Sequence, residues 1–337
     1  MMLRDLFQTP APDVAVEIDH THVAAARLSW RVSQATVSAH ASEPLAAGLV
    51  TPGLAALNIA DVPAVSKVLA GVLAQVGRPS RVSLMVPDTV AKVSLLPLSN
   101  VPSRAADLQE IVRWQVRKTA PFPIEQAVVS VAPGARGADG GTEYVVALSR
   151  ADVIHQYEQA CLMAGAQAGL VDLSTFGVIN GVLGADAAPA GNPAMGSASA
   201  RASSTADWLL VHVTDTYQTL AVMRDSTMLF FRNRGVDEGA LADLIHQTAM
   251  YYEDRLHGFG FARVLIAGAA RLPGGADQVR RGLEDRLRST VEAVDPRHAA
   301  ALADRIGASA ELLDVLAPLV GTLVRERKSR ARLAEAS

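Results

Sequence analysis

The hydrophobic pattern of this chain runs through the same series of elements twice. Apolar residues that alternate, or that recur every three or four positions, predict three strands, a helix and a fourth strand in each series. The first series lies at residues 14–18, 23–30, 33–41, 62–76 and 81–86. The second series lies at residues 208–213, 218–224, 228–233, 240–257 and 262–267. Two units of order βββαβ are therefore expected.

A repeated βββαβ unit is typical of the actin-like, ribonuclease-H-like duplication, in which two halves face a nucleotide cleft. The second unit continues into a predicted helix at 275–288 and a short strand at 290–294. We therefore predict an α/β protein with two actin-like βββαβα halves. A small α/β subdomain is expected to be inserted between them.

The inserted part contains a helix, a proline corner and a strand. Apolar residues at helical spacing predict an amphipathic helix at 104–119, with Ser103 as its N-cap. Pro121 and Pro123 must end this helix by Ala120, because proline lacks an N–H and restricts the residue before it. Phe122 is then held in an extended corner between the two prolines.

Composition narrows the possible functions. Half of the 337 residues are apolar and few are aromatic, which favours layered packing of Ala, Val and Leu. A net charge of −3 gives no electrostatic case for nucleic acid. The single cysteine, Cys161, is expected in the core of a protein in a reducing compartment. We expect neither a signal peptide nor a membrane-spanning run, so any membrane association is indirect.

Four stretches carry a family resemblance: KTAPFPIEQ at 118–126, AGAQAGLVDL at 164–173, MYYED at 250–254 and VLIAGAARLPGG at 264–275. With the flanking elements, from Val14 to about Val324, they resemble PilM, the cytoplasmic actin-like protein of type IV pilus assembly. PilM is related to FtsA and to the cytoplasmic domain of GspL. The resemblance implies a cytoplasmic protein, peripheral at the inner membrane, that binds the N-terminal tail of a PilN-like bitopic membrane protein. Other pilus or secretion platform proteins are further candidate partners.

On this resemblance the chain divides into seven segments. They are a first half (13–86), an inserted small subdomain (87–165), a return to the first half (166–183), a flexible linker (184–206), a second half with a reduced 2B region (207–307), a C-terminal helix packing back on the first half (308–326) and a basic tail (327–337). The linker is mostly Ala, Gly, Ser and Pro, which cannot bury enough surface to become ordered. The basic run RERKSRAR at 325–332 could touch anionic lipid, but a solvated, frayed tail is the more common outcome for such a run.

The resemblance also implies where ATP and Mg²⁺ would bind, if they bind at all. The matching residues are Glu17, Asp19, Thr21, Thr214, Thr216 and Gly268. Asp19 stands where the family has a glycine, Ala24 replaces a lysine, and Thr214 replaces the glycine of the second turn. A carboxylate beside a polyanion costs several kcal/mol at about 4 Å and an intermediate dielectric. We therefore expect no cofactor and no catalytic residue, in a degenerate ATPase.

Two alternatives to a non-catalytic scaffold remain open for the chain. An ATP-binding or ATP-hydrolysing member of the fold, or an FtsA-like filament-forming protein, would share most of the pattern. A peptide-binding surface is expected near Arg113, Trp114, Arg117 and Phe122, although each of these can instead pack the small subdomain. His20 and His22 are close in sequence, but no third ligand lies near them, so no metal site is expected.

Overall fold

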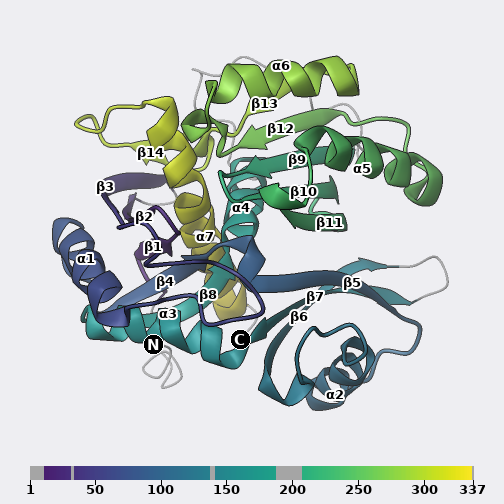
Figure 1. Cartoon of the computed structure of the whole chain (residues 1–337), viewed down its shortest axis with the longest axis horizontal. Coiled ribbons are helices and arrows are strands. Elements are labelled where there is room, and N and C mark those ends of the chain that lie inside the picture. The colour runs from purple at the N-terminus through teal and green to yellow at the C-terminus, as the bar shows by residue number, and fades with distance from the viewer. Residues whose placement is uncertain (1–10, 32–33, 137–140, 187–206, 336–337) are drawn as a thin grey trace.

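The computed structural model describes residues 11–31, 34–136, 141–186 and 207–335, with side chains as far as Lys328. The predicted first unit forms a six-stranded sheet of order β14-β3-β2-β1-β4-β8 (Figure 1). Its strands are β1 Val14–Ile18, β2 His22–Arg31, β3 Gln34–Pro44, β4 Arg81–Val86, β8 Gln167–Leu173 and β14 Ala301–Leu302. β1 pairs antiparallel with β2 and parallel with β4, and β8 is an edge strand. The predicted βββαβ order of this unit is confirmed.

The second unit forms a five-stranded sheet of order β11-β10-β9-β12-β13. Its elements are β9 Asp207–Val213, β10 Tyr217–Arg224, β11 Thr227–Gly235, α5 Leu241–Leu256, β12 Arg263–Ala267, α6 Gly275–Leu287 and β13 Val291–Ala293. β9 pairs antiparallel with β10 and parallel with β12, which repeats the pairing of β1 with β2 and β4. The actin-like duplication is therefore present in three dimensions.

A small subdomain carries the third sheet, of order β5-β7-β6. It comprises β5 Ala91–Leu98, α2 Ala105–Val116, β6 Ala127–Arg136 and β7 Thr142–Arg150. β5 was not predicted, since Pro97 interrupts its pattern; as an edge strand it tolerates a proline. The predicted N-cap Ser103 is wrong: α2 is preceded by Arg104, which makes no side-chain cap bond. The predicted turn at 137–141 lies outside the described residues except for Gly141.

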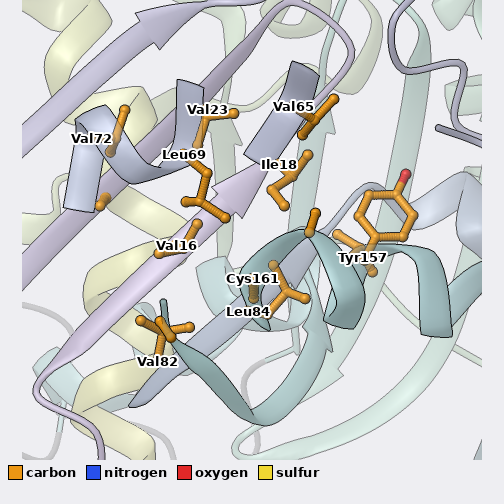
Figure 2. Close-up of a cluster of buried hydrophobic side chains, with 14 of the residues drawn as sticks. Val16, Ile18, Val23, Val65, Leu69, Val72, Val82, Leu84, Tyr157 and Cys161 are labelled. Carbon is orange, nitrogen blue, oxygen red and sulfur yellow. The ribbon is translucent and has the colours of Figure 1, made fainter. Parts of the chain in front are cut away.

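Helices cover the sheets in layers. α1 Val62–Gln75 and α3 Ala151–Met163 pack on one face of the first sheet (Figure 2). Leu69 and Val72 of α1, with Tyr157 and Cys161 of α3, surround the buried side chains of β1. The predicted core position of Cys161 is confirmed, and burial raises the pKa of its thiol to about 12.

Two helices lie between the two large sheets (Figure 1). They are α4 Ser174–Asp186 and α7 Ala310–Glu335. α7 continues through Glu335, so the predicted frayed tail at 327–337 is helical over most of its length. The predicted linker at 184–206 begins with the last turn of α4, and its residues 187–206 lie outside the described residues. Among the described helices none is long and apolar enough to cross a bilayer.

α4 and α7 cross at glycines. A Cβ atom added to Gly321 of α7 would lie 2.0 Å from the Gly177 carbonyl oxygen and 2.4 Å from the Gly181 nitrogen. A Cβ added to Gly177 would lie 2.4 Å from the Pro318 carbonyl oxygen. These distances are far below van der Waals contact and involve backbone, so neither helix can carry a side chain here without moving apart.

We predict that Gly321→Ala lowers the free energy of unfolding by about 1–3 kcal/mol, because the added methyl group overpacks the crossing. Gly71→Ala is the matched control, since Gly71 lies in α1 with no atom near an added Cβ. The control should gain up to about 1 kcal/mol from helix propensity. Urea denaturation measures both changes, and equal stabilities of the two variants would contradict the close crossing.

Candidate functional site

The turn of each half that follows its first strand faces a small cavity between the halves. The β1–β2 and β9–β10 turns, with the loop after β12 and the start of α7, enclose about 130 Å³. Of the six residues predicted for ATP, five line this cavity: Glu17, Asp19, Thr21, Thr214 and Gly268. Thr216 is not among the lining residues. Arg271 and Asp314, which were not predicted from the sequence, also line it.

His20 joins the two turns across the cavity. Its Nε2 lies 3.0 Å from Asp215 Oδ2 in the second half, and its Nδ1 lies 3.0 Å from Asp19 Oδ1. The hydrogen bond to Asp19 raises the pKa of His20. Burial alone would raise the pKa of Asp19, but the hydrogen bond and charge of His20 outweigh it and hold that pKa below its usual value. Asp19 therefore orients an imidazole that bridges the halves.

Beneath this bridge lies a buried carboxyl group, that of Glu17. Burial, followed by the charge of Asp19, raises the pKa of Glu17 to about 8, and the Ser174 hydroxyl hydrogen-bonds to its Oε1 at 2.5 Å. Glu17 is therefore mostly protonated at neutral pH. Burial, followed by the charge of Arg271, lowers the pKa of His22 to about 4. Arg271 Nη1 lies 3.1 Å from both ring nitrogens of His22, so these two lining residues of the cavity contact each other.

Thr214 and Gly268 have structural roles in the second half. The Thr214 hydroxyl accepts from the backbone N–H groups of Thr216 and Tyr217, at 3.2 and 3.0 Å, which closes the β9–β10 turn. Gly268 has φ +81°, and an added Cβ would lie 2.1 Å from the Val213 carbonyl oxygen. Asp314 of α7 accepts from the Ala270 N–H at 2.7 Å, which ties the loop after β12 to the central helix.

A second buried carboxylate, Asp88, connects the halves. Asp88 follows β4 in the first half and is fully buried. It accepts from the Thr175 N–H at 3.1 Å, from the Thr175 hydroxyl, and from the Thr219 hydroxyl at 2.5 Å. Thr175 Oγ1 also lies 2.6 Å from Nδ1 of His212. Since Thr219 and His212 belong to β10 and β9, this network crosses from one half to the other.

The cavity does not fit a magnesium triphosphate. Pockets for small ligands commonly enclose about 300–1,000 Å³, well above the volume found here. Four carboxyl groups line it beside one arginine: Glu17, Asp19, Asp215 and Asp314. The His20 bridge also fills the space where the two turns approach. Within the described residues, no group of three or more His, Cys, Asp or Glu side chains could hold a metal ion.

A larger groove lies between the small subdomain and the first half. It encloses about 650 Å³ and is lined by Val128 of β6, Val171 of β8, and five residues of α3: Ala151, Asp152, Ile154, His155 and Glu158. Its walls are chiefly apolar. β6 and β8 are both edge strands of their sheets, and each contributes one residue to the wall of the groove.

None of the four residues predicted for peptide binding lines this groove. Arg113 donates to the carbonyl oxygens of Ile124 and Ala127, at 2.9 and 3.3 Å, which fixes the proline corner. Phe122 is half-buried against the core of the small subdomain. Arg117 lies 3.9 Å from Glu125, and Trp114 is 72% exposed on α2. Arg113 and Phe122 therefore have packing roles, and Trp114 is left as an exposed aromatic side chain.

The duplicated halves, the cleft between them and the inserted subdomain define an actin-like fold. In structure the chain is similar to PilM of a solved PilM–PilN type IV pilus biogenesis complex, with a TM-score of 0.76 and 17% identity over 94% of this chain and 99% of that one. At this identity the likeness is one of fold.

Two further solved structures match less well. One is a Bacteroides thetaiotaomicron protein with an actin-like ATPase fold, with a TM-score of 0.49 and 8% identity over 83% of this chain and 89% of that one. The other is the cytoplasmic domain of EpsL, from the type II secretion system of Vibrio cholerae, with a TM-score of 0.45 and 10% identity over 94% of each chain. No family model and no curated protein matches the sequence.

We predict that Glu17→Gln flattens the pH dependence of stability. Between its ordinary pKa of 4.5 and its folded pKa of about 8, Glu17 is protonated in the folded state and ionised in the unfolded chain. Folding then binds a proton, so the wild type loses about 1 kcal/mol of stability per pH unit as pH rises through this window. Urea denaturation at several pH values measures the slope, and an unchanged slope in Glu17→Gln would contradict the assignment.

We also predict that Asp88→Ala lowers the free energy of unfolding by about 3 kcal/mol, because two buried hydroxyls and an N–H lose their acceptor. Asp285→Ala is the control, since Asp285 is exposed on α6. It should change stability by less than about 0.5 kcal/mol. A loss no larger than the control's would show that Asp88 does not hold the halves together.

Proposed function

We propose that this protein is a non-catalytic, actin-like scaffold of a type IV pilus or type II secretion-like platform. In this proposal it binds the N-terminal cytoplasmic tail of a PilN-like bitopic membrane protein. It then lies on the cytoplasmic side of the inner membrane, held there by that partner. The observation that carries the proposal is the likeness over almost the whole chain to PilM in a PilM–PilN complex.

The groove between β6 and α3 is the proposed site for that tail. Val128, Ile154 and Val171 offer an apolar floor to side chains of an extended peptide. The bordering edge strands β6 and β8 can pair with its backbone, which is a common mode of peptide recognition. Glu158 also lines the groove, with its Oε2 3.9 Å from Nδ1 of His155, and its carboxylate favours a positively charged segment, such as a free amino terminus or a basic residue. Asp152 is already paired with Arg150.

The absence of catalysis in this proposal is supported by the central cavity. Its volume, its carboxyl groups and the His20 bridge all oppose a bound triphosphate. The scaffold would therefore keep one relative position of its halves instead of opening and closing with nucleotide.

The test is binding of a fluorescent peptide copied from the N-terminal tail of the PilN-like protein of the same organism. We expect Val171→Glu to weaken binding at least about tenfold, since a carboxylate would replace the apolar floor. Leu162→Glu is the matched control, because Leu162 is 66% exposed on α3 and does not line the groove. Unchanged binding by Val171→Glu would place the tail elsewhere.

Calorimetry with ATP and Mg²⁺ tests the second part of the proposal. We expect no heat of binding, because the cavity has neither the volume nor the charge for a triphosphate. Micromolar binding would overturn the non-catalytic assignment and favour an active ATPase. Concentration-dependent sedimentation into long assemblies would instead favour an FtsA-like filament.

A further inference from the structure

The last turns of α7 concentrate positive charge. Between positions 325 and 332 the chain carries one acidic residue, Glu326, and five basic residues: Arg325, Arg327, Lys328, Arg330 and Arg332. The backbone is helical through Glu335, so all of these positions belong to α7. For the whole chain the net charge is −3, so this concentration of charge is local.

The described residues of this segment are fixed against the first half. Arg325 Nη1 lies 2.9 Å from Asp172 Oδ2 of β8, and Lys328 Nζ donates to the Gly184 carbonyl oxygen at 3.0 Å. The guanidinium carbon of Arg327 lies 4.5 Å from the centre of the Trp30 ring. Contacts with β8, α4 and β2 therefore set the direction in which the helix leaves the protein.

This helix end lies at the side of the first half that is remote from the cleft (Figure 1). β2 ends there with the exposed Arg31, and the exposed Arg78 precedes β4 at the same end. Trp30, which packs beside Arg327, is only partly buried. Basic side chains around a partly exposed tryptophan suit the boundary between water and lipid headgroups.

The basic end of α7 and the groove both contact β8. Val171 lines the groove, and the next residue, Asp172, holds Arg325. Successive side chains of a strand point to opposite faces, so the groove and the α7 end flank the two faces of β8. A membrane protein whose tail occupies the groove would thus bring its bilayer close to the basic helix end.

We infer that the basic end of α7 binds anionic lipid headgroups of the membrane in which the proposed partner is anchored. The inference rests on the proposed function for its choice of membrane. Each basic residue near an anionic surface strengthens attachment severalfold, and the effect fades beyond a Debye length. The scaffold would then have two attachments to one bilayer, through the groove and through α7.

Vesicle co-sedimentation of the full chain tests this inference. We expect the wild type to bind vesicles of phosphatidylcholine with phosphatidylglycerol, but not phosphatidylcholine alone, and to be released by high salt. Arg330→Glu with Arg332→Glu should reduce binding at least about tenfold. Arg281→Glu with Arg286→Glu in α6 is the matched control, with the same change of net charge at exposed positions, and it should bind as the wild type does.

The same variants separate this inference from the proposed function. The α7 double variant should keep peptide binding in the groove, and Val171→Glu should keep vesicle binding. Absence of wild-type binding to anionic vesicles would overturn the inference, as would an equal loss in the α6 control. Tighter binding to an oligonucleotide than to the vesicles would also overturn it in favour of a nucleic-acid surface.

Discussion

The arrangement of the halves depends on one buried carboxylate. Asp88 is fully buried in the first half, and a charge in that position is tolerated only when its oxygens are hydrogen-bonded. It accepts hydrogen bonds from the Thr175 N–H at the start of α4 and from the Thr219 hydroxyl of the second half. The dipole of α4 also favours an anion at this end of the helix. Separation of the halves would leave this carboxylate without one of its donors. The small volume of the cleft, and the reach of His20 to Asp215, follow from that constraint.

The start of α4 makes hydrogen bonds to two buried acids, Glu17 and Asp88. Ser174 hydrogen-bonds to Glu17 and Thr175 binds Asp88, so two adjacent residues satisfy carboxyl groups from two different strand ends. α4 can hold this position because its glycines let α7 approach to backbone contact. The hydrogen bonds to the two carboxyl groups at the start of α4 and the close packing against α7 along its length therefore both depend on the position of α4. A shift of α7 would move both carboxyl contacts.

Apolar periodicity and continuous apolar runs in the sequence were sufficient for the two βββαβ units. Helices such as α5 bury one face, and central strands such as β1 and β9 are buried on both. The cleft residues could be predicted only in part. Asp19, Thr21 and Gly268, which the family resemblance assigned to the nucleotide turns, line the cavity, but their contacts there were not predicted. Asp88 was missed because its partners lie 87 and 131 positions away in the chain, and no local pattern links them. The peptide-binding role of Arg113 stays a prediction. Its hydrogen bonds to the carbonyl oxygens of Ile124 and Ala127 could not be predicted, because the proline corner brings these oxygens to it.

The proposed groove and the cleft are joined by a short stretch of chain. β8 borders the groove through Val171 and ends at Leu173, and the next two residues are Ser174 and Thr175, which hold Glu17 and Asp88. An edge strand gains order when a peptide pairs with it, because its free backbone groups become bonded. A tail bound along β8 would therefore stiffen the strand that leads directly into the contacts between the halves. The proposed partner groove and the hydrogen bonds between the halves thus lie on one continuous segment, so a bound tail would act on the central contacts directly through β8.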